Sequence, residues 1–131
     1  MLNPRETTLM VVEDDFLIAM GMEMALQAAG YIVREPLPSV EAALAAVAAQ
    51  PADLALLDVN LAGQQVFPVA DALAARHLPF IFLTGCDEAV LPPRFAGSAI
   101  LVKPVSADKM LTAIGQVLDQ GAAPVSQQPC G

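Results

Sequence analysis

The sequence predicts one α/β domain of the doubly wound class, in which helices cover both faces of a parallel five-stranded sheet. Two observations lead to this class. Short apolar runs alternate with helical patterns along the chain, and 131 residues suit a single domain. A third observation bears on function: polar residues follow directly after four of the apolar runs. In doubly wound sheets, ligands bind outside the carboxyl ends of the strands.

Five short apolar runs bounded by turn residues are predicted to be buried strands. They comprise residues 8–13, 31–35, 53–58, 79–84 and 99–102. Pro36 and Pro38 end the second run, because proline has no N–H to donate to a sheet. The fourth run, PFIFLT, is rich in residues that fit a pleated surface.

The first helix is predicted from Asp15 to about Ala29. Its apolar face is assigned by helical spacing to Leu17, Met20, Met24 and Ala28. Asp15 is interpreted as a capping residue, and Gly30 stands where a helix C′ residue is expected. The methionines at positions 20, 22 and 24 are interpreted as core and helix surface rather than as a binding stripe.

Further helices are predicted over residues 40–50 and 68–76 and after Ser106, where serine caps and a first-turn proline mark the starts. The apolar face of the last helix is predicted to comprise Met110, Leu111, Ile114, Val117 and Leu118. Between residues 86 and 98 only a short or disordered helix over Asp87–Leu91 is predicted. Pro92-Pro93 cannot continue a helix.

Composition excludes several classes of function. The net charge is −8 with only six Lys plus Arg, whereas nucleic-acid binding needs basic patches that neutralise phosphates. The acidity favours a protein partner or bound cations instead. No apolar run reaches the roughly 18 residues of a membrane span, and the N-terminus lacks the order of a signal peptide. A cytoplasmic location is therefore expected.

The predicted organisation is an N-terminal extension (residues 1–7), one domain (8–120) and a disordered tail (121–131) without hydrophobic periodicity. Cys86 and Cys130 are interpreted as free thiols, because one pair of cysteines is not a disulfide framework. A redox role for Cys86 is the alternative. His77, the only histidine, is interpreted as a surface residue at a helix end.

The acidic residues that follow two of the strands predict a metal site. Glu13 and Asp14 end the first strand and Asp58 ends the third, so the three carboxylates are expected to converge and to raise one another's pKa values. A hard divalent cation relieves this repulsion, and Mg²⁺ prefers a few carboxylates with water and phosphate oxygens. The competing interpretation of Glu13 and Asp14 is a solvated loop that caps the first helix.

The remaining polar residues at this edge indicate phosphoryl chemistry. Asp58 is a carboxylate nucleophile that can form an acyl phosphate. Lys103, after the fifth strand, offers a mobile positive charge suited to a phosphoryl group. Thr84, at the end of the fourth strand, offers a hydroxyl donor. The competing interpretations are turn residues at Asp58 and Thr84 and a surface lysine at position 103.

Four segments together resemble the receiver domain of bacterial response regulators: MVVEDD, LALLDVN, the pair Thr84-Gly85 and the VKP of residues 102–104. The resemblance covers roughly residues 8–120. It implies a flavodoxin-like sheet with strand order 2-1-3-4-5, and a role in two-component phosphorelay signalling. Whether the Lys103–Pro104 bond is cis does not follow from the residues.

This resemblance also implies functional roles at the site. Asp58 would accept a phosphoryl group from a histidine kinase or a phosphotransfer protein. Asp14 would ligate Mg²⁺ directly, Glu13 directly or through water, and Asn60 through its backbone carbonyl. Thr84 and Lys103 would contact the phosphoryl group. No enzyme activity is expected beyond the phosphorylation and dephosphorylation of the chain itself.

A narrower resemblance lies in residues 79–85, PFIFLTG, which are similar to the FATGUY subgroup of receivers. Members of this subgroup are often stand-alone domains and are associated with sensor kinases of the HWE or HisKA2 type. The chain departs from the wider family at Ile100, where most receivers carry the aromatic ring that signals phosphorylation. We therefore expect phosphorylation to order residues 86–98 instead.

Three alternatives are weighed against a phosphorylated receiver. A haloacid-dehalogenase-like phosphatase needs an acid two residues after its nucleophile, where this chain has Asn60. A flavin or nucleotide carrier needs a phosphate loop after the first strand, where acidic residues stand instead. A receiver-like domain that only binds a protein partner, independently of phosphorylation, stays open.

Overall fold

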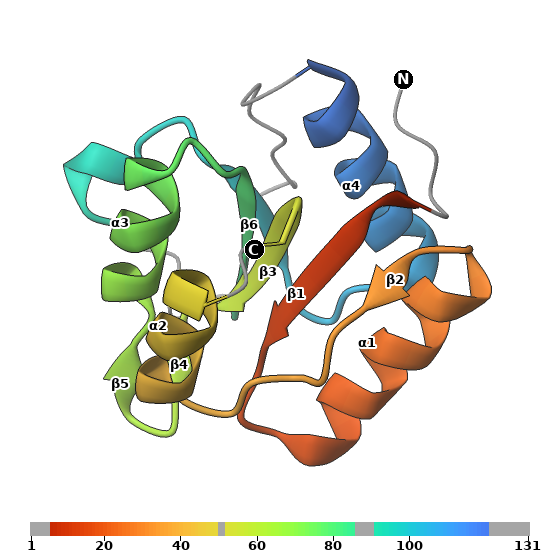
Figure 1. Ribbon diagram of the computed structural model, residues 1–131, viewed down its shortest axis with the longest axis horizontal. Helices are drawn as coiled ribbons and strands as arrows, with labels where there is room; N and C mark the ends of the chain where they lie inside the picture. The colour runs from red at the N-terminus through yellow and green to blue at the C-terminus, as the bar shows by residue number, and fades with distance from the viewer. Residues whose placement is uncertain (1–5, 50–51, 86–90, 121–131) are drawn as a thin grey trace.

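The computed structural model describes residues 6–49, 52–85 and 91–120. Its main sheet is parallel and five-stranded, in the order β2-β1-β3-β6-β7 (Figure 1). The strands are β1 (Thr8–Val12), β2 (Ile32–Val33), β3 (Leu54–Asp58), β6 (Phe80–Thr84) and β7 (Ala99–Val102). The order places the five predicted strands as 2-1-3-4-5, so the predicted doubly wound, flavodoxin-like fold is confirmed.

Two pairs of helices cover the two faces of the sheet (Figure 1). They are α1 (Phe16–Ala28), α2 (Val40–Ala49), α3 (Phe67–Ala75) and α4 (Ala107–Gln120). Buried residues of α2 and α3 share one core cluster, whereas α1 and α4 contribute to a second cluster on the opposite face. Every residue of β3 is buried, because helices on both sides remove the central strand from water.

The second strand is shorter than predicted, with only Ile32 and Val33 in the ladder. The chain nevertheless stays beside β1. The N–H of Arg34 donates to the carbonyl of Leu9, and that of Leu37 donates to the carbonyl of Val11. Pro36 interrupts this edge because it has no N–H to donate.

The helix starts agree with the capping residues predicted from the sequence. Asp15 caps α1, where its carboxylate accepts from the N–H groups of Leu17 and Ile18. The hydroxyls of Ser39 and Ser106 accept backbone N–H groups at the starts of α2 and α4. Each cap satisfies amides that have no partner inside the helix.

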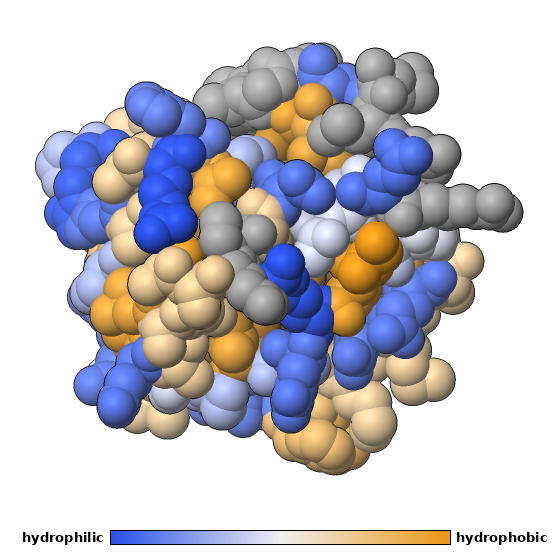
Figure 2. Space-filling view, in the orientation of Figure 1, coloured by the Kyte–Doolittle hydropathy of each residue, from blue (hydrophilic) through white to orange (hydrophobic). Residues whose placement is uncertain are grey.

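The predicted apolar face of α1 is wrong. Leu17 is 71% exposed and Met24 is 64% exposed, whereas Ala19 and Leu26 are buried. Glu23 is the only charged residue in α1, so apolar residues surround the helix and their spacing does not define one face. Hydrophobic surface is consequently visible where α1 begins, at the lower edge of Figure 2. In α4, by contrast, the predicted face is buried or partly buried.

Residues 60–65, for which no strand is predicted from the sequence, form the antiparallel hairpin β4 (Asn60–Leu61) and β5 (Gln64–Gln65). Ala62 and Gly63 make its two-residue turn with φ of 50° and 91°. Positive φ at both central positions is the signature of a type I′ turn. In the sequence Ala-Gly, only the glycine is a residue type that favours this turn.

The described part of the connection between β6 and β7 contains only a short helical turn. A single 3₁₀ turn, η3 (Pro93–Phe95), begins at the second proline, because proline fits the first turn of a helix where its missing N–H has no role. The predicted helical patch over residues 87–91 lies, except for Leu91, outside the described residues. So do Cys86, Cys130, residues 1–5 of the predicted extension and the whole predicted tail.

None of the helices in the described ranges is both long and apolar enough to span a membrane. His77 is exposed directly after α3 and adopts a positive φ of 58°.

Candidate functional site

The site lies at the carboxyl edge of the sheet, where the four neighbouring strands β1, β3, β6 and β7 end side by side. Backbone hydrogen bonds continue past the strand ends: the N–H of Val59 donates to the carbonyl of Leu83 (2.9 Å), and that of Lys103 donates to the carbonyl of Thr84 (2.8 Å). The residues that carry the chemistry are therefore attached to the sheet itself. Asp58 and Thr84 are the last residues of β3 and β6.

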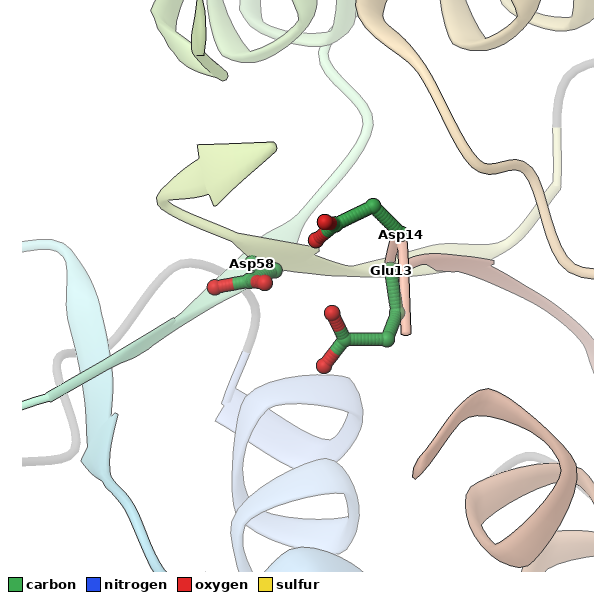
Figure 3. Close-up of side chains that lie close together, drawn as sticks. All are labelled: Glu13, Asp14 and Asp58. Atoms are coloured by element: carbon green, nitrogen blue, oxygen red, sulfur yellow. The ribbon is translucent and has the colours of Figure 1, made fainter. Parts of the chain in front are cut away.

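Three carboxylates converge at this edge, as the sequence predicts. Glu13, Asp14 and Asp58 each offer an oxygen, and these oxygens lie within 4.8 Å of one another. Figure 3 shows the three carboxyl groups directed toward a common space from β3 and the end of β1. Glu13 and Asp58 are buried, whereas Asp14 is exposed, so the space between them opens to solvent on the Asp14 side.

The electrostatics of this cluster depend on Glu13. Burial, the adjacent carboxyl of Asp58 and the charge of Asp58 raise the pKa of Glu13 from 4.5 to about 7. The N–H of Asp15, which donates to Oε2 of Glu13 at 3.3 Å, and the charge of Lys103 lower this pKa only in part. Two buried acids this close cannot both ionise freely without added positive charge.

Lys103 supplies one positive charge. Its Nζ lies 3.1 Å from Oδ1 of Asp58 and 3.4 Å from Oε1 of Glu13. Burial lowers the pKa of Lys103, but its contacts with Asp58 and Glu13 outweigh the burial and hold the pKa above its ordinary value. The lysine is thus a stable cation, and it is followed by a cis bond to Pro104.

The donor set also fits a hard divalent cation. Oδ1 of Asp58 is buried and, among the described residues, accepts no hydrogen bond although Lys103 lies within ion-pair distance. A buried carboxylate oxygen without hydrogen bonds calls for a further ligand. Carboxylate oxygens at this spacing are the ligands that Mg²⁺ prefers.

Thr84 and Asn60 complete the set of predicted site residues. Thr84 is fully buried, and its hydroxyl donates to the carbonyl of Gly85 at 3.1 Å. The side chain of Asn60 accepts the N–H of Gly63 at 3.0 Å and so closes the β4–β5 hairpin. The side chain of Asn60 therefore serves the hairpin.

An apolar cavity beside the carboxylates was not predicted from the sequence. It has a volume of about 440 Å³ and reaches from Glu13 and Lys103 to Ile18, Met22 and Val105. Neither Ile18 nor Met22 belongs to the face that helical spacing assigns to α1. The closely spaced methionines of this helix are the only signal of the cavity in the sequence, and their spacing fits core and helix surface equally well.

Comparisons with known proteins agree with this geometry. The family model of the response regulator receiver domain matches residues 9–115. The chain therefore belongs to the family of response regulator receiver domains of two-component systems. A comparison with curated proteins gives no match.

Solved receiver structures are similar over most of their length. The solution structure of SdrG from Sphingomonas melonis Fr1 is 39% identical, with a TM-score of 0.76 over 86% of this chain and 96% of that one. The receiver domain of the Erythrobacter litoralis response regulator PhyR is 27% identical, with a TM-score of 0.78 over 92% and 96%. The receiver domain of a modulated diguanylate cyclase from Desulfovibrio desulfuricans G20 is 28% identical, with a TM-score of 0.74 over 87% and 94%.

Proposed function

We propose that this receiver is a phosphoacceptor and that Asp58 takes a phosphoryl group from a sensor histidine kinase or a phosphotransfer protein. A carboxylate oxygen of Asp58 forms the new bond to phosphorus, while the bond from phosphorus to the donor's imidazole nitrogen breaks and leaves the electron pair on that nitrogen. The observation that supports this proposal is the buried Oδ1 of Asp58, which accepts no hydrogen bond from the part of the chain that the structure describes and faces the ammonium of Lys103.

The surrounding residues have distinct roles in this proposal. Lys103 already contacts Asp58, so its ammonium is close enough to offset negative charge on the transferred group. The hydroxyl of Thr84 donates to a phosphoryl oxygen after leaving the carbonyl of Gly85. A bound Mg²⁺ would be held by Glu13, Asp14, Asp58 and the backbone carbonyl of Asn60, and would supply charge neutralisation.

The phosphorylated domain then switches a protein–protein contact in the bacterial cytoplasm. The resemblance of residues 79–85 to the FATGUY subgroup supports a donor kinase of the HWE or HisKA2 type. This narrower assignment is tested by phosphotransfer from purified kinases of several types. A faster transfer from an HWE or HisKA2 kinase than from other types supports it, and equal rates contradict it.

Phosphorylation itself is tested with a small phosphodonor. The chain is incubated with acetyl phosphate and Mg²⁺, and intact mass spectrometry is expected to show one added phosphoryl group. The adduct should be absent from Asp58→Asn and retained in Asp108→Asn, which alters an exposed aspartate in the first turn of α4. An unmodified native chain would leave a phosphorylation-independent binding module as the better description, whereas an adduct that persists in Asp58→Asn would assign the phosphoryl group to another residue.

A further inference from the structure

The turn η3, in the connection between β6 and β7, packs against α3 through an ion pair and a buried ring. The guanidinium of Arg94 binds both carboxylate oxygens of Asp71, at 2.9 and 3.0 Å. The same guanidinium lies 4.7 Å from the ring centroid of Phe95. Phe95 is only 4% exposed although it belongs to a one-turn helix. The exposed Arg94–Asp71 ion pair and the buried ring of Phe95 thus both attach η3 to the rest of the domain.

One route from Phe95 leads to the phosphoacceptor. Its ring stacks on that of Phe67, the first residue of α3, at a centroid distance of 5.7 Å. The residue before Phe67 is Val66, whose N–H donates to the carbonyl of Val59 at 2.9 Å. Val59 directly follows Asp58. A shift in the backbone after Asp58 is therefore transmitted to a ring that touches Phe95.

A second route leads to the threonine. The ring of Phe95 lies edge-on to that of Phe82, 5.3 Å away, and Phe82 stands two residues before Thr84 on the same face of β6. The hydroxyl of Thr84 is bonded to the carbonyl of Gly85, at the start of the connection that carries Phe95. Donation to a phosphoryl oxygen on Asp58 requires this bond to break.

The strand beyond β6 offers no aromatic ring at the corresponding level. Ile100 pairs in register with Phe82 and packs partly buried against the same aromatic cluster. An aliphatic side chain there can fill space but cannot exchange between a buried and an exposed ring position. Phe95, on the preceding turn, contacts both Phe67, which begins α3, and Phe82, which lies on the strand that ends at Thr84.

We propose that Phe95 and the Arg94–Asp71 pair are the conformational switch of this receiver, and that phosphorylation of Asp58 weakens the pair and moves η3 relative to α3. The inference rests on the proposed phosphoacceptor function. The switch has two arrangements of one packed turn, and the phosphoryl group favours the arrangement in which Thr84 has left Gly85. The surface formed by η3 and α3 is the part of the domain that changes for a partner protein.

Linkage gives a direct test, since a pair that is stronger without the phosphoryl group opposes its binding. Beryllofluoride with Mg²⁺ serves as the phosphoryl mimic, and its dissociation constant is measured for the native chain and for Arg94→Gln. The variant is expected to bind up to about fivefold more tightly, because the exposed ion pair no longer opposes the bound arrangement. Removing a positive charge by itself would weaken anion binding, so the expected sign is specific to the switch.

Two variants serve as controls. Arg76→Gln removes the same charge from an exposed residue at the end of α3 and should bind no more tightly than the native chain. Arg94→Lys keeps the charge but loses the two-pronged contact with Asp71, so it should behave like Arg94→Gln. In parallel, selective labelling of phenylalanine rings should show the Phe95 signals shifting when beryllofluoride binds.

The outcomes separate the two proposals. Binding to the native chain, with unchanged affinity in Arg94→Gln and unmoved Phe95 signals, would overturn the switch alone. A complete absence of beryllofluoride binding to the native chain would overturn the phosphoacceptor function and the switch with it.

Discussion

The ammonium of Lys103 lies 3.1 Å from Oδ1 of Asp58, although Asp58 ends β3 and Lys103 follows β7, and these two strands are not neighbours. Strand β6 separates β3 from the end of β7, so the lysine side chain extends across the edge of the sheet to reach the aspartate. A long unbranched side chain with a point charge suits this span. The contact gives the site a fixed positive charge at the atom proposed to react.

Replacing this lysine should slow phosphorylation without unfolding the domain. Lys103→Gln removes the charge that faces Asp58, and loss of a preorganised electrostatic contact of this kind costs about 10²–10³ in rate. The measurement is the rate of adduct formation with acetyl phosphate at saturating Mg²⁺. Lys109→Gln, at an exposed lysine of α4, is the matched control. Equal rates for the two variants would remove Lys103 from the reaction.

Stability without metal should fall as the pH rises, because folding raises the pKa of Glu13 from 4.5 to about 7. The folded state binds this proton more tightly than the unfolded state. Its stabilising contribution is therefore complete below pH 4.5 and is lost as the pH rises through about 7. The loss is expected to be about 1–3 kcal/mol.

Urea unfolding in a chelating buffer between pH 4.5 and 8 measures this loss, and Glu13→Gln is the reference that cannot titrate. The free energy of unfolding of the native chain should decline more steeply with pH than that of the variant. Added Mg²⁺ should restore stability to the native chain at the upper end of the range. Parallel curves for the two proteins would show that Glu13 titrates normally.

The corrected orientation of α1 predicts very different costs for two leucines in the same helix. Leu26→Ala should lower the free energy of unfolding by about 2–5 kcal/mol, because Leu26 is fully buried. Leu17→Ala should change it by less than about 0.5 kcal/mol, because Leu17 is largely exposed. Urea titration of both variants decides the matter, and similar losses would favour the face that helical spacing alone assigns.

The hairpin turn predicts a stabilising exchange. Ala62 adopts a φ of 50°, which glycine tolerates better than alanine. Ala62→Gly should raise the free energy of unfolding by about 0.5–1 kcal/mol. Ala45→Gly, on the exposed side of α2, should lower it by about 1 kcal/mol. Thermal unfolding gives the sign of each change, and a loss in both variants would contradict the strained turn.

The sheet and the convergence of Glu13, Asp58 and Lys103 at one edge could be predicted because they follow from local signals. Buried strands appear in the sequence as short apolar runs, and topology alone brings their carboxyl ends together. The resemblance of the segments around these residues to receiver domains strengthened the prediction. The roles of these residues remain predictions that the experiments above address.

The elements that were mispredicted are those whose conformation depends on packing rather than on local pattern. The face of α1 was missed because the helix is apolar nearly all round. The β4–β5 hairpin was missed because Ala62 is an unusual residue for its conformation. The position of η3 depends on Phe95, whose ring is held by aromatic neighbours on α3 and β6. Such contacts are distant in sequence and leave no periodic signal.

Because the hydrogen-bond ladder continues past the strand ends to Val59 and Lys103, the spacing of the reactive groups is set by the strand separation of about 4.8 Å. Loop length has little influence on it. Changes in the length or sequence of residues 92–98 are therefore compatible with an unchanged arrangement of Glu13, Asp58 and Lys103. The surface offered to a partner protein can vary in this way without altering the proposed phosphorylation. The same division offers a route to engineered signalling, in which one unchanged site is joined to different partner-binding surfaces.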